Sequence, residues 1–249
     1  YVGIVAGYIG TTLGSTGDVI AGDPAVGTII SGCTTAGAVS GRNNIGGIFG
    51  MLQGPEFAGH VQSENTYSYE VRADWIGRIV GLSSSAAVSG SGENIGGLVG
   101  QLYELSVRMS NVTGAINGGD IVGGIVGFGY RCDIESCYTT SNITGQKRVG
   151  GIVGVANYRP CIEYCYSEGV ITGTGGSYPG SSDMYAAGVG GIAGVTDADR
   201  IHKCYSLGNI IGVYRVGGLI GSYIGGGEAS PNIIMVYARG NVSASAGQA

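Results

Sequence analysis

Carboxylates are the first groups in this sequence that could do chemistry, because glycan-cleaving enzymes use acidic side chains gathered at one place. Asp133, Glu135 and Glu163 fall at or near one position of a repeated segment, so they could stack as an acidic stripe. Asp197 and Asp199 are oxygen donors of the kind that Ca²⁺ prefers, but the sequence shows no complete ligand set. Solvated carboxylates in turns explain the same pattern, and we favour that interpretation.

Histidine and serine give little support to catalysis. The chain has 2 histidines, His60 and His202, which are far apart in the sequence. His202 takes the repeat position held elsewhere by Glu135 and Glu163, which predicts an exposed strand residue. No serine lies in a nucleophile-elbow context. We therefore predict no catalytic residue, no metal site and no cofactor.

Tyrosines recur at one position of the repeat, each directly after a small residue: Tyr138, Tyr166, Tyr205 and Tyr237. If the small residue points inward, strand alternation sends the tyrosines outward, stacked as a ladder. Such a ladder could simply stabilise the stack. It could also form an aromatic strip for contact with a glycan or a protein, because tyrosine combines a large surface with a polar tip. Both interpretations stay open.

A recurring glycine-rich hexapeptide indicates the fold that positions the carboxylates and the tyrosines. VGGIVG at 149–154 has close copies that start at 45, 95, 122, 189 and 216, and several of these starts are separated by one constant interval. A fixed period of this size, about 27 residues, predicts a solenoid. The β-branched residues favour strands, since each glycine in a helix would cost about 1 kcal/mol. We predict an all-β, right-handed parallel β-helix (β-solenoid) of seven to nine coils, each of about 27 residues with three short strands.

One repeat domain is expected over residues 1–249, with loop insertions near 54–74 and 173–188 that could carry a binding surface or be plain solvated loops. We call each copy of the glycine-rich hexapeptide a glycine box, and the position 12 residues before it the slot. The slot residue is small or apolar and is predicted to line the inner wall of the solenoid. Its occupants are Cys33, Ser83, Ser110, Cys137, Cys165, Cys204 and Val236, where Cys165 precedes the longer insertion and Val236 the unfinished last unit.

Composition excludes several classes of protein. The chain has 249 residues with 52 glycines, 43% hydrophobic and 12% charged residues, so neither collagen nor a charged disordered segment fits. A net charge of −5 without a basic cluster argues against nucleic acid as a partner. No run reaches the roughly 18–20 apolar residues of a membrane helix, so no membrane insertion is predicted. The first residues lack the basic segment of a signal peptide, and we expect an excised portion of a longer chain.

Two segments carry a family resemblance. CYSEGVITG at 165–173 and CYSLGNIIG at 204–212, each combined with a glycine box, resemble the GLUG-motif repeat. That repeat occurs in large bacterial surface and secreted proteins, including IgA-specific metallopeptidases and haemagglutinin-like adhesins. The resemblance covers most of the chain, from about 33 to 243, and implies an extracellular, non-catalytic β-solenoid. It does not imply protease activity, because the zinc signature HExxH is absent.

The 6 cysteines suggest disulfides in an extracellular chain. Cys132 and Cys161 each precede a slot cysteine by four or five residues in adjacent coils. Equivalent positions one coil apart should have Cα atoms about 5 Å apart, within the disulfide range. We therefore predict Cys132–Cys161 as the favoured bridge and Cys137–Cys165 as the second choice. Cys33 should be a free thiol, and Cys204 could reach only Cys165.

The sequence thus predicts a non-catalytic structural or adhesive module of a bacterial extracellular protein. The alternatives are a carbohydrate-active β-helix enzyme that uses the acidic stripe, and a subunit of a self-assembling filament. The expected partners are neighbouring repeats or copies of the chain stacked end to end, because an uncapped solenoid leaves strand edges unpaired. A host glycan or protein is a further expected partner.

Overall fold

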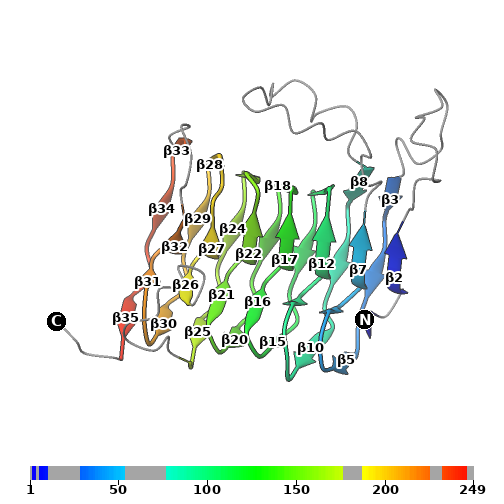
Figure 1. The fold of residues 1–249 in the computed structure, drawn as a ribbon, viewed down its shortest axis with the longest axis horizontal. Coiled ribbons are helices and arrows are strands. Elements are labelled where there is room, and N and C mark those ends of the chain that lie inside the picture. Colours follow the sequence, from blue (N-terminus) through cyan, green and yellow to red (C-terminus); the bar gives the residue numbers. More distant parts are fainter. Residues whose placement is uncertain are drawn as a thin grey trace.

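The chain winds into a parallel β-solenoid. The computed structural model describes residues 2–3, 6–10, 29–53, 77–175, 187–224 and 232–245. Within these ranges the regular elements are all strands, and they form five sheets of seven strands each. Figure 1 shows the strands stacked coil on coil along the long axis. The prediction of an all-β parallel β-solenoid is confirmed.

Each coil contributes one strand to each of five sheets, which we name A to E in chain order. Sheet A holds β1 (Val2–Gly3), β6 (Ile45–Gly46), β11 (Ile95–Gly96), β16 (Ile121–Gly123), β21 (Arg148–Gly150), β26 (Gly188–Gly190) and β31 (Val216–Gly217). Sheet B holds β2 (Ala6–Gly10), β7 (Phe49–Gln53), β12 (Val99–Tyr103), β17 (Val126–Tyr130), β22 (Val153–Asn157), β27 (Ala193–Thr196) and β32 (Ile220–Tyr223).

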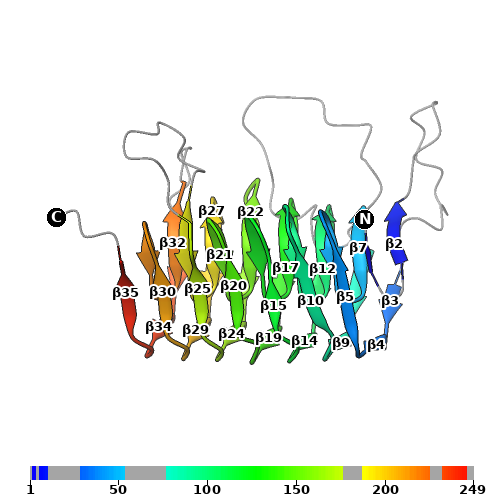
Figure 2. The same cartoon turned by 90° about the horizontal axis from the view of Figure 1, so that it is seen from below.

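The other three sheets complete the coil, and Figure 2 shows sheets D and E running side by side along the solenoid. Sheet C holds β3 (Ile29–Ser31), β8 (Gly77–Val80), β13 (Leu105–Arg108), β18 (Asp133–Glu135), β23 (Cys161–Glu163), β28 (Arg200–His202) and β33 (Asn232–Ile234). Sheet D holds β4 (Thr34–Thr35), β9 (Ser83–Ser84), β14 (Asn111–Val112), β19 (Tyr138–Thr139), β24 (Tyr166–Ser167), β29 (Tyr205–Ser206) and β34 (Tyr237–Ala238). Sheet E holds β5 (Ala38–Gly41), β10 (Ala87–Gly90), β15 (Ile116–Asn117), β20 (Ile143–Gly145), β25 (Ile171–Gly173), β30 (Ile210–Gly212) and β35 (Val242–Ala244).

The register confirms the predicted period. Val99 pairs with Val126, and Val126 pairs with Val153, so these coils advance by the interval that separates the glycine boxes. The prediction of three strands in a coil is wrong, because a coil has five. The glycine box is not one strand but two, since its central residues bend the chain between sheets A and B.

The box needs glycine because two stretches of backbone meet there. A Cβ added at Gly123 would collide with the carbonyl oxygen of Val126 in the same box. One added at Gly124 would collide with the carbonyl oxygen of Gly151 in the next coil and lie 2.7 Å from Thr139 Cγ2 across the core. The bend therefore brings sheet A and sheet D together at a separation that no side chain permits.

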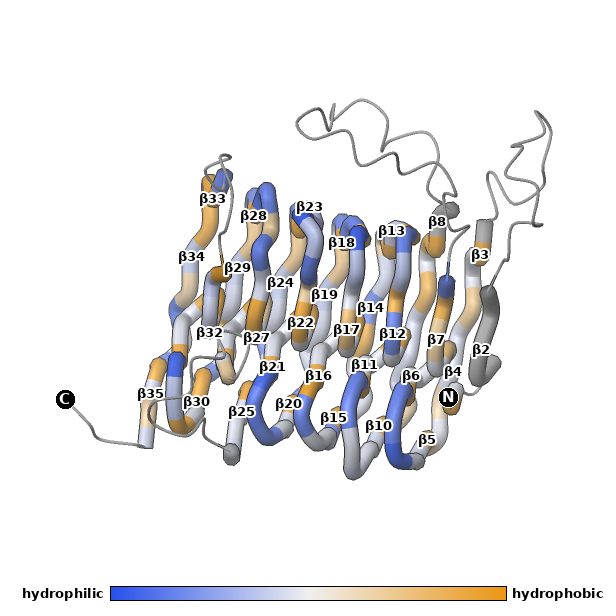
Figure 3. Tube along the Cα trace, in the orientation of Figure 1, coloured by the Kyte–Doolittle hydropathy of each residue, from blue (hydrophilic) through white to orange (hydrophobic). Residues whose placement is uncertain are grey.

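The core lies inside the coils and is built of columns of identical or similar side chains. Ile116, Ile143 and Ile171 pair in register along sheet E, and each is fully buried. Figure 3 shows apolar and polar stretches alternating along each coil and lining up between coils. Stacked apolar columns remove surface from water in every coil alike, which accounts for the recurrence of branched apolar residues at these positions.

A left-handed corner joins sheet C to sheet D in every coil. Gly81 has a φ of 68° and open space where a Cβ would be, so glycine suits it for conformational reasons alone. An L-residue in this region costs roughly 1–2 kcal/mol. The corner is nevertheless non-glycine from the third coil onward: Met109, Ser136, Tyr164, Lys203 and Met235.

Two sequence predictions need correction or fall outside the described ranges. Leu82, not Ser83, occupies the second slot, because the turn before Ile95 is one residue longer than the turn before Ile45. The predicted insertion at 54–74 lies wholly outside the described residues, as does His60, and so does 176–186, which is most of the predicted insertion at 173–188.

Candidate functional site

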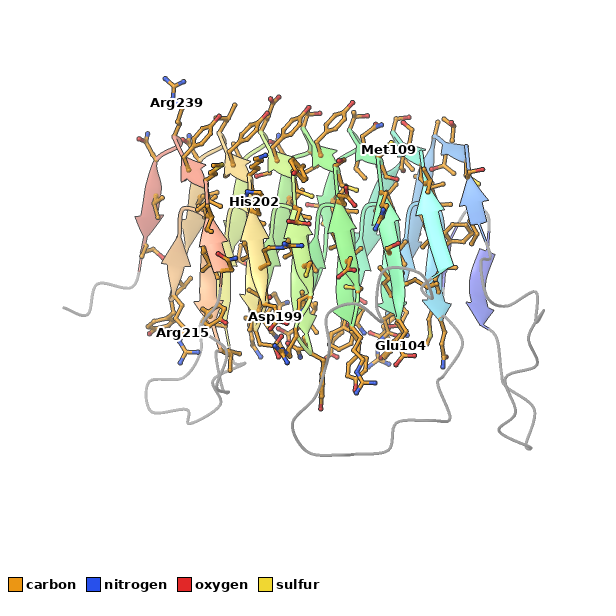
Figure 4. All side chains as sticks on the ribbon, turned by 90° about the horizontal axis from the view of Figure 1, so that it is seen from above. Glu104, Met109, Asp199, His202, Arg215 and Arg239 are labelled. Atoms are coloured by element: carbon orange, nitrogen blue, oxygen red, sulfur yellow. The ribbon has the colours of Figure 1, made fainter. Side chains whose placement is uncertain are left out.

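Four tyrosines of sheet D form a continuous ladder, which we name the tyrosine ladder: Tyr138, Tyr166, Tyr205 and Tyr237. Successive ring centroids are 4.9, 4.8 and 5.1 Å apart, with interplanar angles of 4°, 3° and 6°. Figure 4 shows the stacked rings along one edge of the solenoid, between the labelled Met109 and Arg239. The predicted ladder is therefore present, and its rings are parallel.

The slot and the left-handed corner position the ladder. Cys137, Cys165 and Cys204 occupy the slot immediately before three of the tyrosines, and all three are fully buried, as predicted. Strand alternation then sends each following ring outward. The same column holds polar residues in the earlier coils, where Ser83 Oγ donates a hydrogen bond to Asn111 Oδ1 at 3.0 Å. The aromatic part of the column is thus confined to four coils.

The two inner hydroxyls of the ladder stay protonated near neutral pH. Burial, followed by the neighbouring tyrosines and the Glu168 carboxylate, raises the pKa of Tyr166 above its usual 10.0. Burial, Tyr237 and Glu168 raise the pKa of Tyr205 in the same way. A protonated phenol can both donate and accept a hydrogen bond. The middle of the ladder therefore presents neutral hydroxyls.

Exposed apolar side chains flank the ladder. Two residues before the rings, the corner exposes Tyr164 (45%) and Met235 (68%). Two residues after them, Leu207 is 37% exposed. The Lys203 ammonium lies 4.9 Å from the centroid of the Tyr164 ring, a cation–π distance. The ladder is the centre of a mixed aromatic and aliphatic strip rather than an isolated row.

The predicted acidic stripe is compensated by basic side chains. Arg108, Glu135, Glu163 and His202 occupy one column of sheet C, as the sequence position of His202 predicted. Glu135 forms an ion pair with Arg108 at 3.3 Å, and Glu163 forms one with Arg200 at 2.9 Å. His202 Nδ1 lies 3.4 Å from Glu163, and the His202 side chain is 23% exposed, so it is half-buried and not exposed as predicted.

Asp133 does not share that column. It pairs with Cys161, and its Oδ1 accepts a hydrogen bond from the Cys161 backbone N–H at 3.2 Å. Glu135 and Glu163 alone therefore form the acidic part of the column, and they are not joined by a third carboxylate.

Asp197 and Asp199 hold a corner of the chain. Asp197 accepts hydrogen bonds from the backbone N–H groups of Tyr158 and Arg159, at 3.0 and 3.2 Å. Asp199 Oδ1 forms an ion pair with Arg159 Nε at 2.6 Å. Across the described part of the chain no group of three or more His, Cys, Asp or Glu side chains could hold a metal ion. These contacts give both carboxylates a structural role.

The geometric premise for a Cys132–Cys161 bridge is wrong. Cys161 pairs with Asp133, so Cys132 is one residue out of register with it. The reason is the corner after sheet B, where Tyr158 and Arg159 both take positive φ but only Arg131 does so in the preceding coil. One extra residue in this corner shifts the following strand. All six cysteines are thiols in the structure.

Three slot cysteines form a buried column, which we name the thiol column: Cys137, Cys165 and Cys204. Burial and the adjacent Cys137 thiol raise the pKa of Cys165 well above 9.0. A hydrogen bond with Cys165, together with burial, raises the pKa of Cys204. Cys137 and Cys165 do occupy equivalent positions, since the next residues pair in register. The structure shows them as neighbouring buried thiols.

One aromatic cluster was not predicted from the sequence. Tyr103 and Tyr130 pair in register at the end of sheet B, with ring centroids 5.7 Å apart. Tyr158 lies 4.4 Å from Tyr130, and the Arg131 guanidinium lies over both rings. Arg131 also pairs with Glu104 at 3.2 Å. Tyr103 and Tyr130 follow their glycine boxes at the same distance in the sequence, and this was the signal that could have revealed the cluster.

Helices of the length and apolarity needed to cross a membrane do not occur in the described ranges. Comparison of the chain with protein-family models, with curated proteins and with solved structures gives no significant match. The resemblance to GLUG-motif repeats therefore stays a prediction that rests on the residues quoted for it.

Proposed function

We propose that this chain is a non-catalytic structural and adhesive repeat module of a bacterial extracellular or cell-surface protein. The observation that carries the proposal is the tyrosine ladder. It places four identical, partly exposed aromatic side chains at a constant spacing on the outside of the solenoid. Aromatic side chains with a polar tip are enriched in binding surfaces, because they offer area and a hydrogen bond together.

The solenoid supports an adhesive role by keeping the ladder straight. Every ladder residue donates a main-chain hydrogen bond to the preceding coil, such as Tyr166 N–H to Cys137 O at 3.1 Å and Tyr205 N–H to Cys165 O at 3.1 Å. A preordered surface loses little conformational entropy when a ligand binds. The same rigidity suits a spacer that holds a binding strip away from a cell.

The enzymatic alternative is less well supported by the carboxylates. Glu135, Glu163 and Asp199 each face an arginine within 3.3 Å. A glycan-cleaving site needs one carboxylic acid and one carboxylate that face the same bond. Glu135 and Glu163 do lie in one column of sheet C, but each is ion-paired with an arginine. Asp199 lies outside that column and pairs with Arg159, so we retain the non-catalytic proposal.

End-to-end stacking of repeats or copies has support of its own. Ile233 and Val242 belong to core columns, since they pair with Ile201 and Ile210. They are 39% and 47% exposed, although their partners are buried. An additional coil or a second copy on this face would cover them. This observation favours neighbouring repeats as partners and also suits the filament alternative.

The test is an adhesion measurement on the purified chain. A printed array of glycans and a panel of extracellular-matrix proteins are probed with the wild type and with a variant that changes all four ladder tyrosines to threonine. Threonine is the matched replacement, because Thr34 occupies the same column in β4. We expect binding to at least one class of target and its loss in the variant. Equal signals for the two proteins across the array and panel would overturn the proposal.

A further inference from the structure

The spacing of the rings in the tyrosine ladder matches the repeat distance of some extended polymers and not of others. Its rings repeat every 4.8 to 5.1 Å along the solenoid axis, which is the spacing of parallel strands. A peptide strand lying along the ladder repeats its side chains on one face every 6.4–6.8 Å, approximately, so it falls out of step by about 1.5–2 Å with each tyrosine. An extended β-1,4-linked glycan advances by nearly the ladder spacing with each sugar.

The exposed chemistry of the ladder suits a hydroxyl-rich partner. Because each ring is parallel to its neighbour within 6°, the faces of the inner rings are covered by other rings. What they present outward is a row of ring edges and hydroxyls. A purely apolar partner would leave these hydroxyls without hydrogen bonds, which is unfavourable once water is excluded. Sugar hydroxyls can pair with them.

The charges around the strip favour an uncharged polymer. Glu168 lies close enough to Tyr166 and Tyr205 to act on both phenols. Lys203 and Arg239 lie on the two flanks of the ladder and are exposed. A strip with both signs of charge has no excess potential to attract a polyanion or a polycation.

We propose that the tyrosine ladder binds a single chain of a neutral, extended β-1,4-linked glycan lying parallel to the solenoid axis, with one sugar at each tyrosine. This inference rests on the proposed adhesive function and names its ligand class. Each sugar is held weakly by one ring edge and one hydroxyl. Linked sugars bind at the next tyrosine as an intramolecular step, so affinity rises with chain length until all four tyrosines are engaged.

The experiment is isothermal titration of the intact chain with β-1,4-linked glucose and N-acetylglucosamine oligomers of two to six sugars. The α-1,4-linked glucose hexamer, which coils, is the matched control ligand. We expect the tetramer and hexamer of at least one β-1,4 series to bind ten-fold or more tighter than its dimer, and the α-1,4 hexamer not to bind. Tyr166→Thr and Tyr205→Thr should each weaken hexamer binding at least ten-fold. Tyr130→Thr, in the other aromatic cluster, should leave it unchanged.

The outcomes separate this inference from the proposed function. If neither β-1,4 hexamer binds while adhesion to other targets still requires the ladder, the glycan inference is wrong and the adhesive function stands. If the wild-type chain adheres to no target, both the glycan inference and the adhesive function are wrong. Sedimentation of the free protein tests the competing occupant: a dimer that Tyr166→Thr abolishes would show that a second copy covers the ladder, and would overturn the glycan inference. A circular dichroism spectrum of each variant confirms that its strands are retained.

Discussion

Removing one ring from the middle of the tyrosine ladder should destabilise the solenoid more than removing one from its end. Tyr166 is stacked between two rings, at 4.9 and 4.8 Å, whereas Tyr237 has one stacked neighbour among the described residues, at 5.1 Å. An aromatic pair contributes about 0.5–1.5 kcal/mol beyond its buried area. Tyr166→Thr should therefore lower the free energy of unfolding by about 1–3 kcal/mol, and Tyr237→Thr by about half as much.

Equilibrium urea unfolding followed by circular dichroism measures both losses, provided that the slope against urea is unchanged. A double-mutant cycle with Tyr166→Thr and Tyr205→Thr should return a coupling energy of about 0.5–1.5 kcal/mol. Asn111→Thr is the control, since it changes the same column beside the first ring of the ladder without removing a ring, and it keeps an oxygen for Ser83. Equal losses at Tyr166 and Tyr237, or a coupling energy near zero, would show that the stacking does not stabilise the fold.

Three further predictions concern the box, the phenols and the thiols. Gly124→Ala forces a methyl group onto the backbone of the next coil and should destabilise the chain by about 3 kcal/mol. The methyl group of Gly81→Ala meets open space, so this variant should lose only the roughly 1–2 kcal/mol that its left-handed conformation costs. Similar urea midpoints for the two variants would contradict this reasoning. Because the folded-state pKa of the inner ladder phenols is raised above 10.0, the folded state resists their ionisation, so their contribution to stability should be constant below pH 10 and be lost as the pH rises through the folded pKa. Unfolding measured between about pH 9 and 12 should show this fall in the wild type and a weaker one in the variant without ladder tyrosines. The thiol column should resist alkylation at about pH 8 in the folded chain while the half-buried Cys33 reacts, and labelling of all four at one rate would refute this expectation.

The sequence by itself determined the period, the sheet type and the ladder. The interval between the boxes and the glycines within them can be read directly from the chain, and in a parallel solenoid equal spacing becomes equal position in the stack. The slot before each tyrosine was recognisable because buried positions in a repeat accept only small or apolar residues. Alternation along a strand then placed Tyr166 and its equivalents outside.

Only the tertiary structure decided the register of individual strands and the ion pairs between coils, and the register depends on the number of residues in each corner. One extra residue at Tyr158 and Arg159 moved Cys161 opposite Asp133 and removed the premise for its bridge with Cys132, because register propagates from each corner into the next strand. The acidic stripe became a set of ion pairs because arginines far away in sequence, such as Arg108 and Arg200, reach the neighbouring coil. Such contacts follow from stacking distance rather than from any local pattern, so they could not be read from the chain before its coils were aligned.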